Sequence, residues 1–405
     1  MRFHRNISFA VIDALMAIFN EGEYADKVVA RALKLDKRWG SSDRKFVAET
    51  IYDIVRWKRL YAEIAEIKKE PFDRDGIWRM FAVWATLKGH TLPDWKYFEG
   101  TPVRKIKGKF DELSKDRKFK ESIPDWMDEI GVKELGEAVW SKEIKAQNEP
   151  AKVILRTNTI NTTKEALKLE LLKLDIHTQA IEDYPEALVL DERANVFMTD
   201  AFKNGMFEVQ DASSQMVAHM LDIQPGMRVV DTCAGAGGKT LHMACLMQNK
   251  GQIIAMDLYE SKLKQLKIRA KRNGIHNIEY RVIDTTKVIK KLHGQADRVL
   301  IDAPCSGLGV LKRNPDAKWK LKPEFIDNIR KVQAEVLESY APIVKPGGKL
   351  VYATCSVLPS ENEEQVKKFL ATETGKNFTF VQDKKVLAHE SGYDGFYMAL
   401  LTRNN

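Results

Sequence analysis

Residues 228–240 read Arg228-Val-Val-Asp-Thr-Cys-Ala-Gly-Ala-Gly-Gly-Lys-Thr240. An apolar run ends in an aspartate and is followed at once by a glycine-rich turn, whose glycines let the backbone approach a ligand closely. Alternation of strands with helices beyond this turn is typical of a parallel sheet. We therefore predict an α/β fold with a Rossmann-like, doubly wound sheet. The strands expected to follow lie at 251–257, 278–284, 296–302 and 347–355, with an antiparallel edge at 378–382 and 395–402.

The chain before this sheet divides into two parts by its periodicity. Residues 1–145 carry apolar residues at helical spacing and show little strand-like alternation. Near Pro150 the pattern changes, because strand-like alternation and a short helix with Thr162 or Thr163 as N-cap follow one another. We expect three domains, namely a helical domain over 1–145, a small α+β module over 146–205 and the α/β domain over 206–405.

The composition fits a cytoplasmic protein that meets a polyanion. The net charge is +8 and the pI is near 9, which suits nucleic acid but also fits a lysine-rich surface. The basic stretch 104–120 is expected to be a solvated connection or an RNA-facing surface. No apolar run reaches the roughly 20 residues that cross a bilayer. The basic and then apolar N-terminus resembles a signal peptide, but Asp13, Glu21 and Glu23 interrupt it, so a helix is expected there.

An acidic residue stands at the end of each of four predicted strands. These residues are Asp231, Asp257, Asp284 and Asp302. In open α/β sheets, ligands bind beyond the carboxyl ends of the strands, so four carboxylates there favour a ligand with several hydroxyl and amine groups. Asp257 follows the glycines at about 20 residues, the distance at which a carboxylate reaches ribose hydroxyls. The alternative is the phosphate loop of an NTPase, but that loop needs glycine where this chain has Cys233.

The chain has four cysteines, and their spacing argues against structural roles. Cys233, Cys245, Cys305 and Cys355 form no Cys-x-x-Cys pair, so we expect neither a disulfide scaffold nor a metal site. Cys305 and Cys355 each follow a predicted strand, and neighbouring strand ends face the same crevice. Two thiols beside carboxylates favour covalent catalysis, in which a thiolate adds to carbon 6 of cytosine and so activates carbon 5 for methylation.

Six segments of the second half of the chain occur together in a fixed order. They are FEVQDASSQ (207–215), DTCAGAGGKT (231–240), AMDLYESKL (255–263), DAPCSGLGVLKRNPDAKW (302–319), ATCSVLPSENEEQV (353–366) and DGFYMALL (394–401). In these segments the chain resembles the RsmB/Nol/Nop/Sun group of 5-methylcytosine RNA methyltransferases. One departure lies in the turn, where Gly235-Ala236 replaces the usual Ala-Pro. More loosely, 1–140 is similar to the NusB-like RNA-binding domain of bacterial members, and 150–205 to the family's RNA-recognition-like subdomain.

The resemblance implies S-adenosylmethionine as cofactor and RNA, expected to be ribosomal RNA, as substrate, with no obligate protein partner evident. It also implies that Cys355 is the nucleophile and that Cys305 assists product release. The chemistry itself adds a role for Asp302, which can protonate or hydrogen-bond nitrogen 3 of the base and so make carbon 6 more electrophilic. The residues expected to line the cofactor site are Cys233, Ala234, Gly235, Ala236, Gly237, Gly238, Lys239, Asp257, Asp284 and Asp302.

Two alternatives to this interpretation remain at the sequence level. A DNA cytosine-5 methyltransferase would use Cys305, in its Pro-Cys motif, as the nucleophile, but no large target-recognition segment follows the fifth strand. A non-catalytic RNA-assembly factor with a vestigial site is the other alternative. The presence of both cysteines and all four strand-end carboxylates weighs against it.

Overall fold

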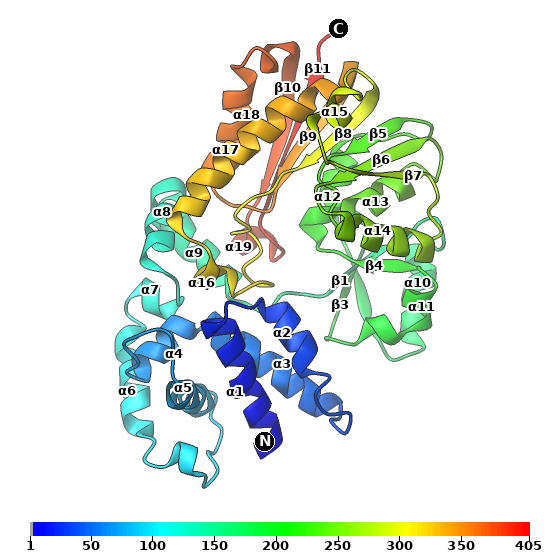
Figure 1. Ribbon diagram of the computed structural model, residues 1–405. Coiled ribbons are helices and arrows are strands. Elements are labelled where there is room, and N and C mark those ends of the chain that lie inside the picture. Colours follow the sequence, from blue (N-terminus) through cyan, green and yellow to red (C-terminus); the bar gives the residue numbers. More distant parts are fainter. Residues whose placement is uncertain (1–2) are drawn as a thin grey trace. The chain divides into compact units, whose positions relative to one another are not determined.

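The computed structural model describes residues 3–405 and divides into two compact units. Unit 1 comprises the chain up to Glu149 together with Leu311–Pro323, and unit 2 comprises Pro150–Val310 and Glu324–Asn405 (Figure 1). A short segment that follows Cys305 therefore belongs to the helical unit, a division that sequence periodicity did not indicate. Between residues 3 and 405, no helix is long and apolar enough to cross a membrane.

Unit 1 is helical, as predicted for the N-terminal region. Val11, Leu15, Ile51, Ile54 and Phe81 are buried in its core, and the helical spacing of such residues places them on one face of each helix. Its elements are α1 (Arg5–Asn20), α2 (Ala25–Ala32), α3 (Ser41–Arg56), α4 (Lys58–Ile64), α5 (Arg74–Leu87), η1 (Lys96–Phe98), α6 (Val103–Leu113), α7 (Arg117–Lys120), α8 (Asp125–Leu135), α9 (Glu137–Gln147) and α16 (Ala317–Lys320). The basic stretch 104–120, expected to be a connection or an RNA-facing surface, is mostly helical, in α6 and α7.

Lys318 of α16 joins the ends of three helices of unit 1. Its side chain is 0 % exposed, and its ammonium group donates to the carbonyls of Arg56 (3.2 Å), Glu121 (3.1 Å) and Ser122 (3.1 Å) and to Oδ1 of Asn148 (2.7 Å). These oxygens lie at or just after the C-terminal ends of α3, α7 and α9, where helix carbonyls lack partners and the helix dipole favours a cation. Burial, and then the nearby Arg56 guanidinium, lowers the pKa of Lys318 well below its usual value, so these four acceptors are what holds the amine in place.

Replacing Lys318 with methionine should destabilise unit 1 specifically. The change keeps most of the side-chain volume but leaves three of the four buried oxygens without a donor, since the carbonyl of Glu121 also accepts from Asn148. We expect the free energy of unfolding to fall by about 3–5 kcal/mol. All eight tryptophans of the chain belong to unit 1, and urea unfolding followed by tryptophan fluorescence reports on it alone. The exposed Lys322→Met is the matched control, and equal transitions for the two variants would contradict this role.

A four-stranded antiparallel sheet forms the first part of unit 2. Its strands are arranged in the order β2 (Thr178–Ile181), β3 (Tyr184–Leu190), β1 (Ile154–Thr157) and β4 (Phe207–Val209). It packs with α10 (Lys164–Leu172), η2 (Val196–Met198) and α11 (Asp200–Lys203) around a core that contains Leu155, Leu171 and Leu188. Thr163 is the N-cap of α10 and accepts from Ala166 N. The expected module boundary at 205 falls before β4, whose pairing with β1 was not predicted.

A seven-stranded sheet forms the rest of unit 2, and the predicted α/β fold class is confirmed. The strand order is β10 (Phe378–Val386), β11 (Phe396–Arg403), β9 (Val344–Thr354), β8 (Ala296–Asp302), β5 (Arg228–Asp231), β6 (Gln252–Asp257) and β7 (Ile278–Val282). The strands from β9 to β7 are parallel, whereas β11 pairs antiparallel with β9 and β10, as the tail sequence suggested. Strands β6 and β7 lie on one side of β5, and β8 and β9 lie on the other. The strand order thus reverses between β5 and β8, where sheets of this kind have the crevice that binds ligands.

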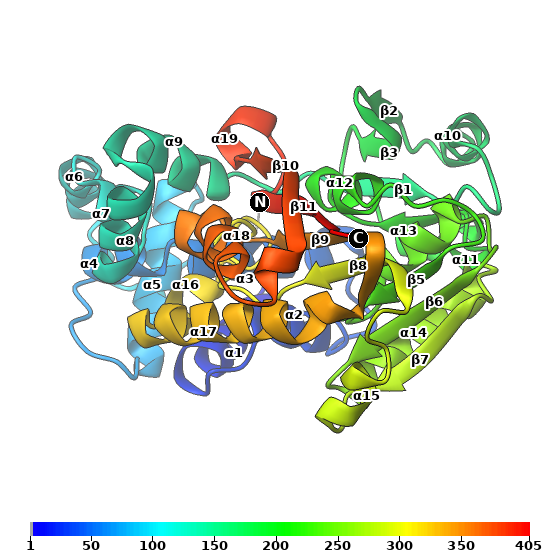
Figure 2. The same ribbon diagram turned by 90° about the horizontal axis from the view of Figure 1, so that it is seen from above.

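Helices cover both faces of this sheet. Successive strand residues such as Val229 and Val230 belong to different cores, one shared with α12 (Ala212–Met220), α13 (Gly238–Leu246) and α14 (Glu260–Arg272), the other with α15 (Thr286–Lys290), α17 (Pro323–Tyr340) and α18 (Glu363–Leu370). Figure 2 shows α17 and α12 on opposite sides of β8 and β9. The remaining short elements are η3 (Ala341–Ile343), η4 (Pro359–Glu361), η5 (Gly375–Asn377) and α19 (Ala388–Ser391).

Candidate active site

The ends of two adjacent parallel strands bring two thiols together. Cys305 lies in the loop after β8, and Cys355 follows the last residue of β9. Their Sγ atoms are 3.3 Å apart, although 50 positions separate the residues in the chain. Both cysteines are free and partly accessible. The sequence-based expectation that Cys305 and Cys355 share a crevice agrees with this geometry.

The two thiols differ in their surroundings. The hydrogen bond to Cys355, followed by burial, raises the pKa of Cys305 well above its usual value. Cys305 therefore keeps its proton and can donate it towards the sulfur of Cys355. A thiol that donates to a second sulfur stabilises the negative charge on that second sulfur.

A buried carboxylate holds the two cysteine loops in register. Glu361, at the end of η4, is 0 % exposed. Its Oε1 accepts from the hydroxyls of Ser306 (2.5 Å) and Ser356 (2.6 Å), and its Oε2 accepts from Ser306 N (2.8 Å) and Gln333 Nε2 (2.9 Å). The two serines follow the two cysteines directly, and their hydroxyl oxygens are 3.1 Å apart. One side chain thus fixes both loops through the residue next to each thiol.

Sequence reasoning did not assign Glu361, Gln333 or the serines to the site. The available signal was the repetition of Ser after Cys at both strand ends, and the Ser-Glu-Asn run at 360–362 shortly after Cys355. Asn362 contributes as well, because its side chain bonds to the hydroxyl of Thr354 and donates to the carbonyl of Ser356. Most partners of Glu361 lie far from it in the sequence, so no local pattern indicates that its carboxylate is buried or which groups bond to it.

Glu361→Ala should loosen the link between the two thiols. It removes the acceptor of four hydrogen bonds in a buried place, and we expect the free energy of unfolding of unit 2 to fall by about 2–4 kcal/mol. The more direct readout is the rate at which oxidised glutathione drives a Cys305–Cys355 disulfide, measured by mass spectrometry on the folded protein. We expect this rate to fall several-fold. The exposed Glu364→Ala is the control, and an unchanged rate in Glu361→Ala would show that the carboxylate does not position the thiols.

Lys239 and Asp302 form an ion pair at the same edge of the sheet. Nζ of Lys239, in the first turn of α13, lies 2.7 Å from Oδ2 of Asp302, the last residue of β8. Burial alone would lower the pKa of Lys239, but the Asp302 carboxylate outweighs it and raises that pKa. Among residues 3–405, Oδ1 of Asp302 has no hydrogen-bond partner. The pair leaves one carboxylate oxygen available to a ligand, and Lys239 is not the surface lysine of a helix start.

Two arginines donate hydrogen bonds to backbone carbonyls of the glycine-rich turn after β5. Arg269 donates to the carbonyl of Ala236 (2.6 Å), and the buried Arg156 donates to the carbonyl of Gly238. Gly237 has a φ of 88° and any Cβ there would collide with the side chain of Leu266, so only glycine fits. Arg156, which lies in the small module's first strand, therefore supports the turn. These arginines fix a turn that lacks the family's usual proline.

The turn presents an open cradle beside buried carboxylates. Gly235 has a φ of 54°, and a Cβ added to it would meet no atom within 4 Å, which means open space on its ligand side. Asp231 is 1 % exposed; its Oδ2 accepts from the Thr240 hydroxyl (2.7 Å), and its buried Oδ1 has no partner within the described chain. Burial raises the pKa of Asp231 to about 7. An orphaned buried oxygen next to open space fits a ligand that carries hydrogen-bond donors.

The other predicted cofactor residues are placed differently from one another. Asp257 ends β6 and is nearly buried, and its carboxylate accepts from Gly235 N (2.8 Å) and Tyr259 N (2.8 Å). Asp284 lies two residues beyond β7 and is exposed, without the buried contacts of Asp257. Cys233 and Ala234 begin the turn, and burial raises the pKa of Cys233 to about 12, so its thiol stays protonated. Asp257 is thus better placed than Asp284 to contact a ligand at the glycine-rich turn.

Comparison with known families gives two matches along the chain. Residues 218–402 match the model of "16S rRNA methyltransferase RsmB/F". Residues 123–197 match the model of the ferredoxin-like domain of RsmF/B-like methyltransferases. The first match contains both cysteines, the glycine-rich turn and Glu361, and the second contains most of the small antiparallel sheet.

Individual relatives and solved structures agree with these matches. The chain is 29% identical to a probable ribosomal RNA small subunit methyltransferase B of Synechocystis, over 98% of this chain and 99% of that protein. It is 33% identical to the probable enzyme of the same description from Bacillus subtilis, over 70% of this chain and 66% of that protein. The crystal structure of PH0851 superposes with a TM-score of 0.84 at 27% identity, over 99% of both chains.

Proposed function

Because the chain belongs to the RsmB/F family of 16S rRNA methyltransferases, and so is an S-adenosylmethionine-dependent RNA methyltransferase, we propose that it methylates carbon 5 of a cytosine in ribosomal RNA through a covalent bond to Cys355. The observation that carries this proposal is the pair of thiols, with Sγ atoms 3.3 Å apart, at the carboxyl ends of β8 and β9. Methylation of an exocyclic nitrogen or of a ribose hydroxyl would need no thiol. We place the activity in the cytoplasm, where bacterial ribosomal RNA is found.

The chemistry explains the need for a nucleophile. Carbon 5 of cytosine is a poor nucleophile, and addition of the Cys355 thiolate to carbon 6 gives it enamine character. A proton shared between the free oxygen of Asp302 and nitrogen 3 of the bound base would make carbon 6 more electrophilic. After methylation, the carbon 5 proton must leave, and its bonding electrons restore the ring double bond as the bond between carbon 6 and Cys355 breaks.

Cys305 is placed to serve the second half of the reaction. Its sulfur lies beside the sulfur that must be expelled, and its raised pKa makes it a proton carrier rather than a competing nucleophile. Glu361 keeps the two loops together through Ser306 and Ser356 while the base is bound. We propose that Cys305 assists the release of Cys355 by donating a hydrogen bond to the departing sulfur, and that Glu361 acts only by positioning.

The residues at the turn fit S-adenosylmethionine. The open space at Gly235, the unpaired Oδ1 of Asp231 and the strand-end carboxylate of Asp257 provide acceptors for the hydroxyl and amine donors of the cofactor. When bound, the cofactor supplies an electrophilic methyl group. Lys239 and Asp302 lie at the boundary between this cradle and the thiols, which suits a role in orienting both ligands.

Asp257→Ala should weaken cofactor binding far more than Asp284→Ala. Asp257 is nearly buried and orders the turn through Gly235, whereas Asp284 is exposed beyond β7. Loss of a charged acceptor of this kind costs about 1.5–3 kcal/mol, so we expect a roughly 10- to 100-fold rise in the dissociation constant of S-adenosylmethionine. Isothermal titration calorimetry gives both constants. Equal losses in the two variants would place the cofactor differently.

Covalent trapping distinguishes the roles of the two cysteines. With S-adenosylmethionine and ribosomal RNA lacking the modification, Cys305→Ala should accumulate an RNA-linked band on denaturing electrophoresis, because attack proceeds and release fails. Cys355→Ala should form no such band and no methylated product. Nucleoside digestion of RNA treated with the wild type should yield 5-methylcytidine. The opposite pattern of bands would assign attack to Cys305, and methylation at another position would overturn the proposed chemistry.

A further inference from the structure

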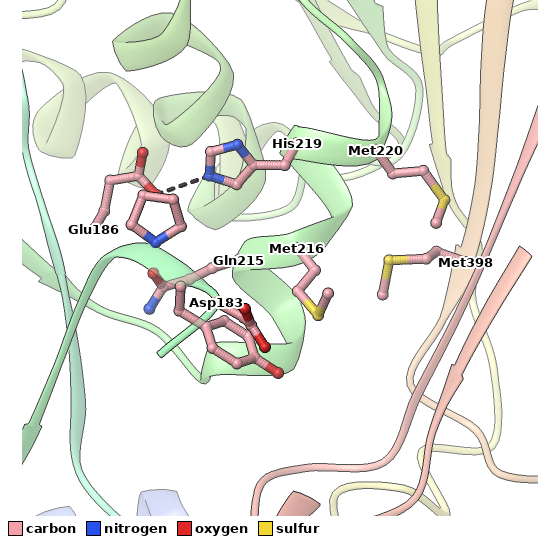
Figure 3. Close-up of a pocket in the computed structure, with 9 residues that line it drawn as sticks. Asp183, Glu186, Gln215, Met216, His219, Met220 and Met398 are labelled. Carbon is pink, nitrogen blue, oxygen red and sulfur yellow. Dashed lines mark hydrogen bonds and ion pairs between the residues drawn. The ribbon is translucent and has the colours of Figure 1, made fainter. Parts of the chain in front are cut away.

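A second group of polar side chains lies in unit 2, made by residues that the methyl-transfer proposal does not use. Glu186 comes from β3 of the small sheet, His219 from α12 and His242 from α13. One potential ligand atom of each lies within 4.8 Å of the others. Figure 3 shows Glu186 and His219 joined by a hydrogen bond beside a pocket that both of them line. Three segments distant in sequence thus converge on one point.

His242 is buried without the hydrogen bonds that a buried imidazole normally makes. It is 0 % exposed, and neither ring nitrogen has a hydrogen-bond partner within residues 3–405. Its Nε2 lies 3.5 Å from Oε2 of Glu186, beyond the usual range for such a bond, while Nε2 of His219 lies 2.8 Å from the same oxygen. A buried polar group left unsatisfied costs free energy. The imidazole is therefore aimed at the cluster without being satisfied by it.

The cluster borders a cavity that could admit an ion and water. The cavity has a volume of about 250 Å³ and is lined in part by Glu186, His219, Met216, Met220 and Met398. Figure 3 shows the three thioether side chains on the side of the cavity away from Glu186. A water molecule occupies about 30 Å³ in the liquid, so the space exceeds that of a single ion. Glu186 and His219 line the cavity and His242 does not, so an ion would enter past the first two side chains.

We propose that Glu186, His219 and His242 form a binding site for a divalent cation of the zinc class, with the fourth coordination position open to the cavity. Two imidazoles and one carboxylate are a donor set that suits Zn²⁺. With bonds of about 2.0–2.1 Å in a tetrahedral site, ligand atoms lie roughly 3.3 Å apart. The distances of 2.8 Å and 3.5 Å from Oε2 of Glu186 to the two Nε2 atoms bracket that value.

The nearby arginine bonds to other groups and leaves the Glu186 carboxylate available to an ion. The nearby cation is Arg156, whose guanidinium donates to Gln210 and to the carbonyl of Gly238. His219 is partly exposed and can rotate to complete the site, whereas His242 is fixed in α13 one turn after Lys239. No metal site was expected from the spacing of the cysteines, and Glu186, His219 and His242 lie too far apart in the chain to form a recognisable ligand motif.

An ion at this position would connect the small sheet to the helix that follows the glycine-rich turn. Glu186 belongs to β3, and α13 begins at Gly238. Binding to the folded chain alone stabilises it by mass action, so Zn²⁺ should raise the melting temperature by several degrees. The site is separate from methyl transfer, and the following test does not depend on activity.

The test uses the full chain with Cys305→Ser and Cys355→Ser, which removes the two thiols as competing ligands. After treatment with a chelator, this protein should bind one equivalent of Zn²⁺ by calorimetry and give the visible absorption of tetrahedral cobalt when titrated with Co²⁺. His219→Ala and Glu186→Gln should each weaken binding at least about tenfold. His276→Ala, an exposed histidine outside the cluster, is the matched control and should leave affinity unchanged.

Two results would overturn the site. One is the absence of stoichiometric binding of either ion to the chelator-treated protein. The other is equal affinity in the parent, His219→Ala and Glu186→Gln, which would place the ion elsewhere. Melting curves guard against unfolded variants, because His219→Ala should melt cooperatively without the stabilisation by Zn²⁺ that the parent shows.

Discussion

The arrangement of the active site depends on one buried carboxylate. Glu361 accepts hydrogen bonds from the backbone and hydroxyl of Ser306, from the hydroxyl of Ser356 and from Gln333. A fully buried carboxylate is costly unless donors surround it, and here the donors that satisfy it are the neighbours of the two cysteines. The requirement to satisfy Glu361 therefore also sets the 3.3 Å separation of the two sulfurs. The hydrogen bonds that satisfy Glu361 therefore also position Cys305 and Cys355.

The parallel sheet supplies the frame in which this constraint acts. Because β5, β8 and β9 are neighbours, the glycine-rich turn, Asp302 and both cysteines emerge at one edge. The Lys239–Asp302 pair joins the turn to the thiol side of that edge. The chain beyond Cys305 then contributes Leu311–Pro323 to unit 1, where Lys318 binds the ends of three helices. The segment between β8 and α17 thus contains Cys305 of unit 2 and the buried Lys318 of unit 1.

Much of this could be predicted from the sequence. The strands from 228 to 302, the antiparallel tail and the helical N-terminal region follow from periodicity, and strand ends bring Cys305 and Cys355 together. The short strands β2 and β4 were missed because three or four residues carry too little alternation. Glu361, Arg156 and the Glu186 cluster depend on contacts between distant segments, which no local pattern encodes.

The central claim is that Cys355 attacks the base while Cys305 remains protonated beside it. It is tested most directly with the wild-type protein, S-adenosylmethionine and ribosomal RNA that contains 5-fluorocytosine, whose fluorine cannot leave as the carbon 5 proton does. After protease and nuclease digestion, mass spectrometry identifies the peptide that carries the nucleotide. The account predicts attachment to Cys355. Attachment to Cys305 would contradict it, because the hydrogen bond between the two thiols would then not activate Cys355 for attack.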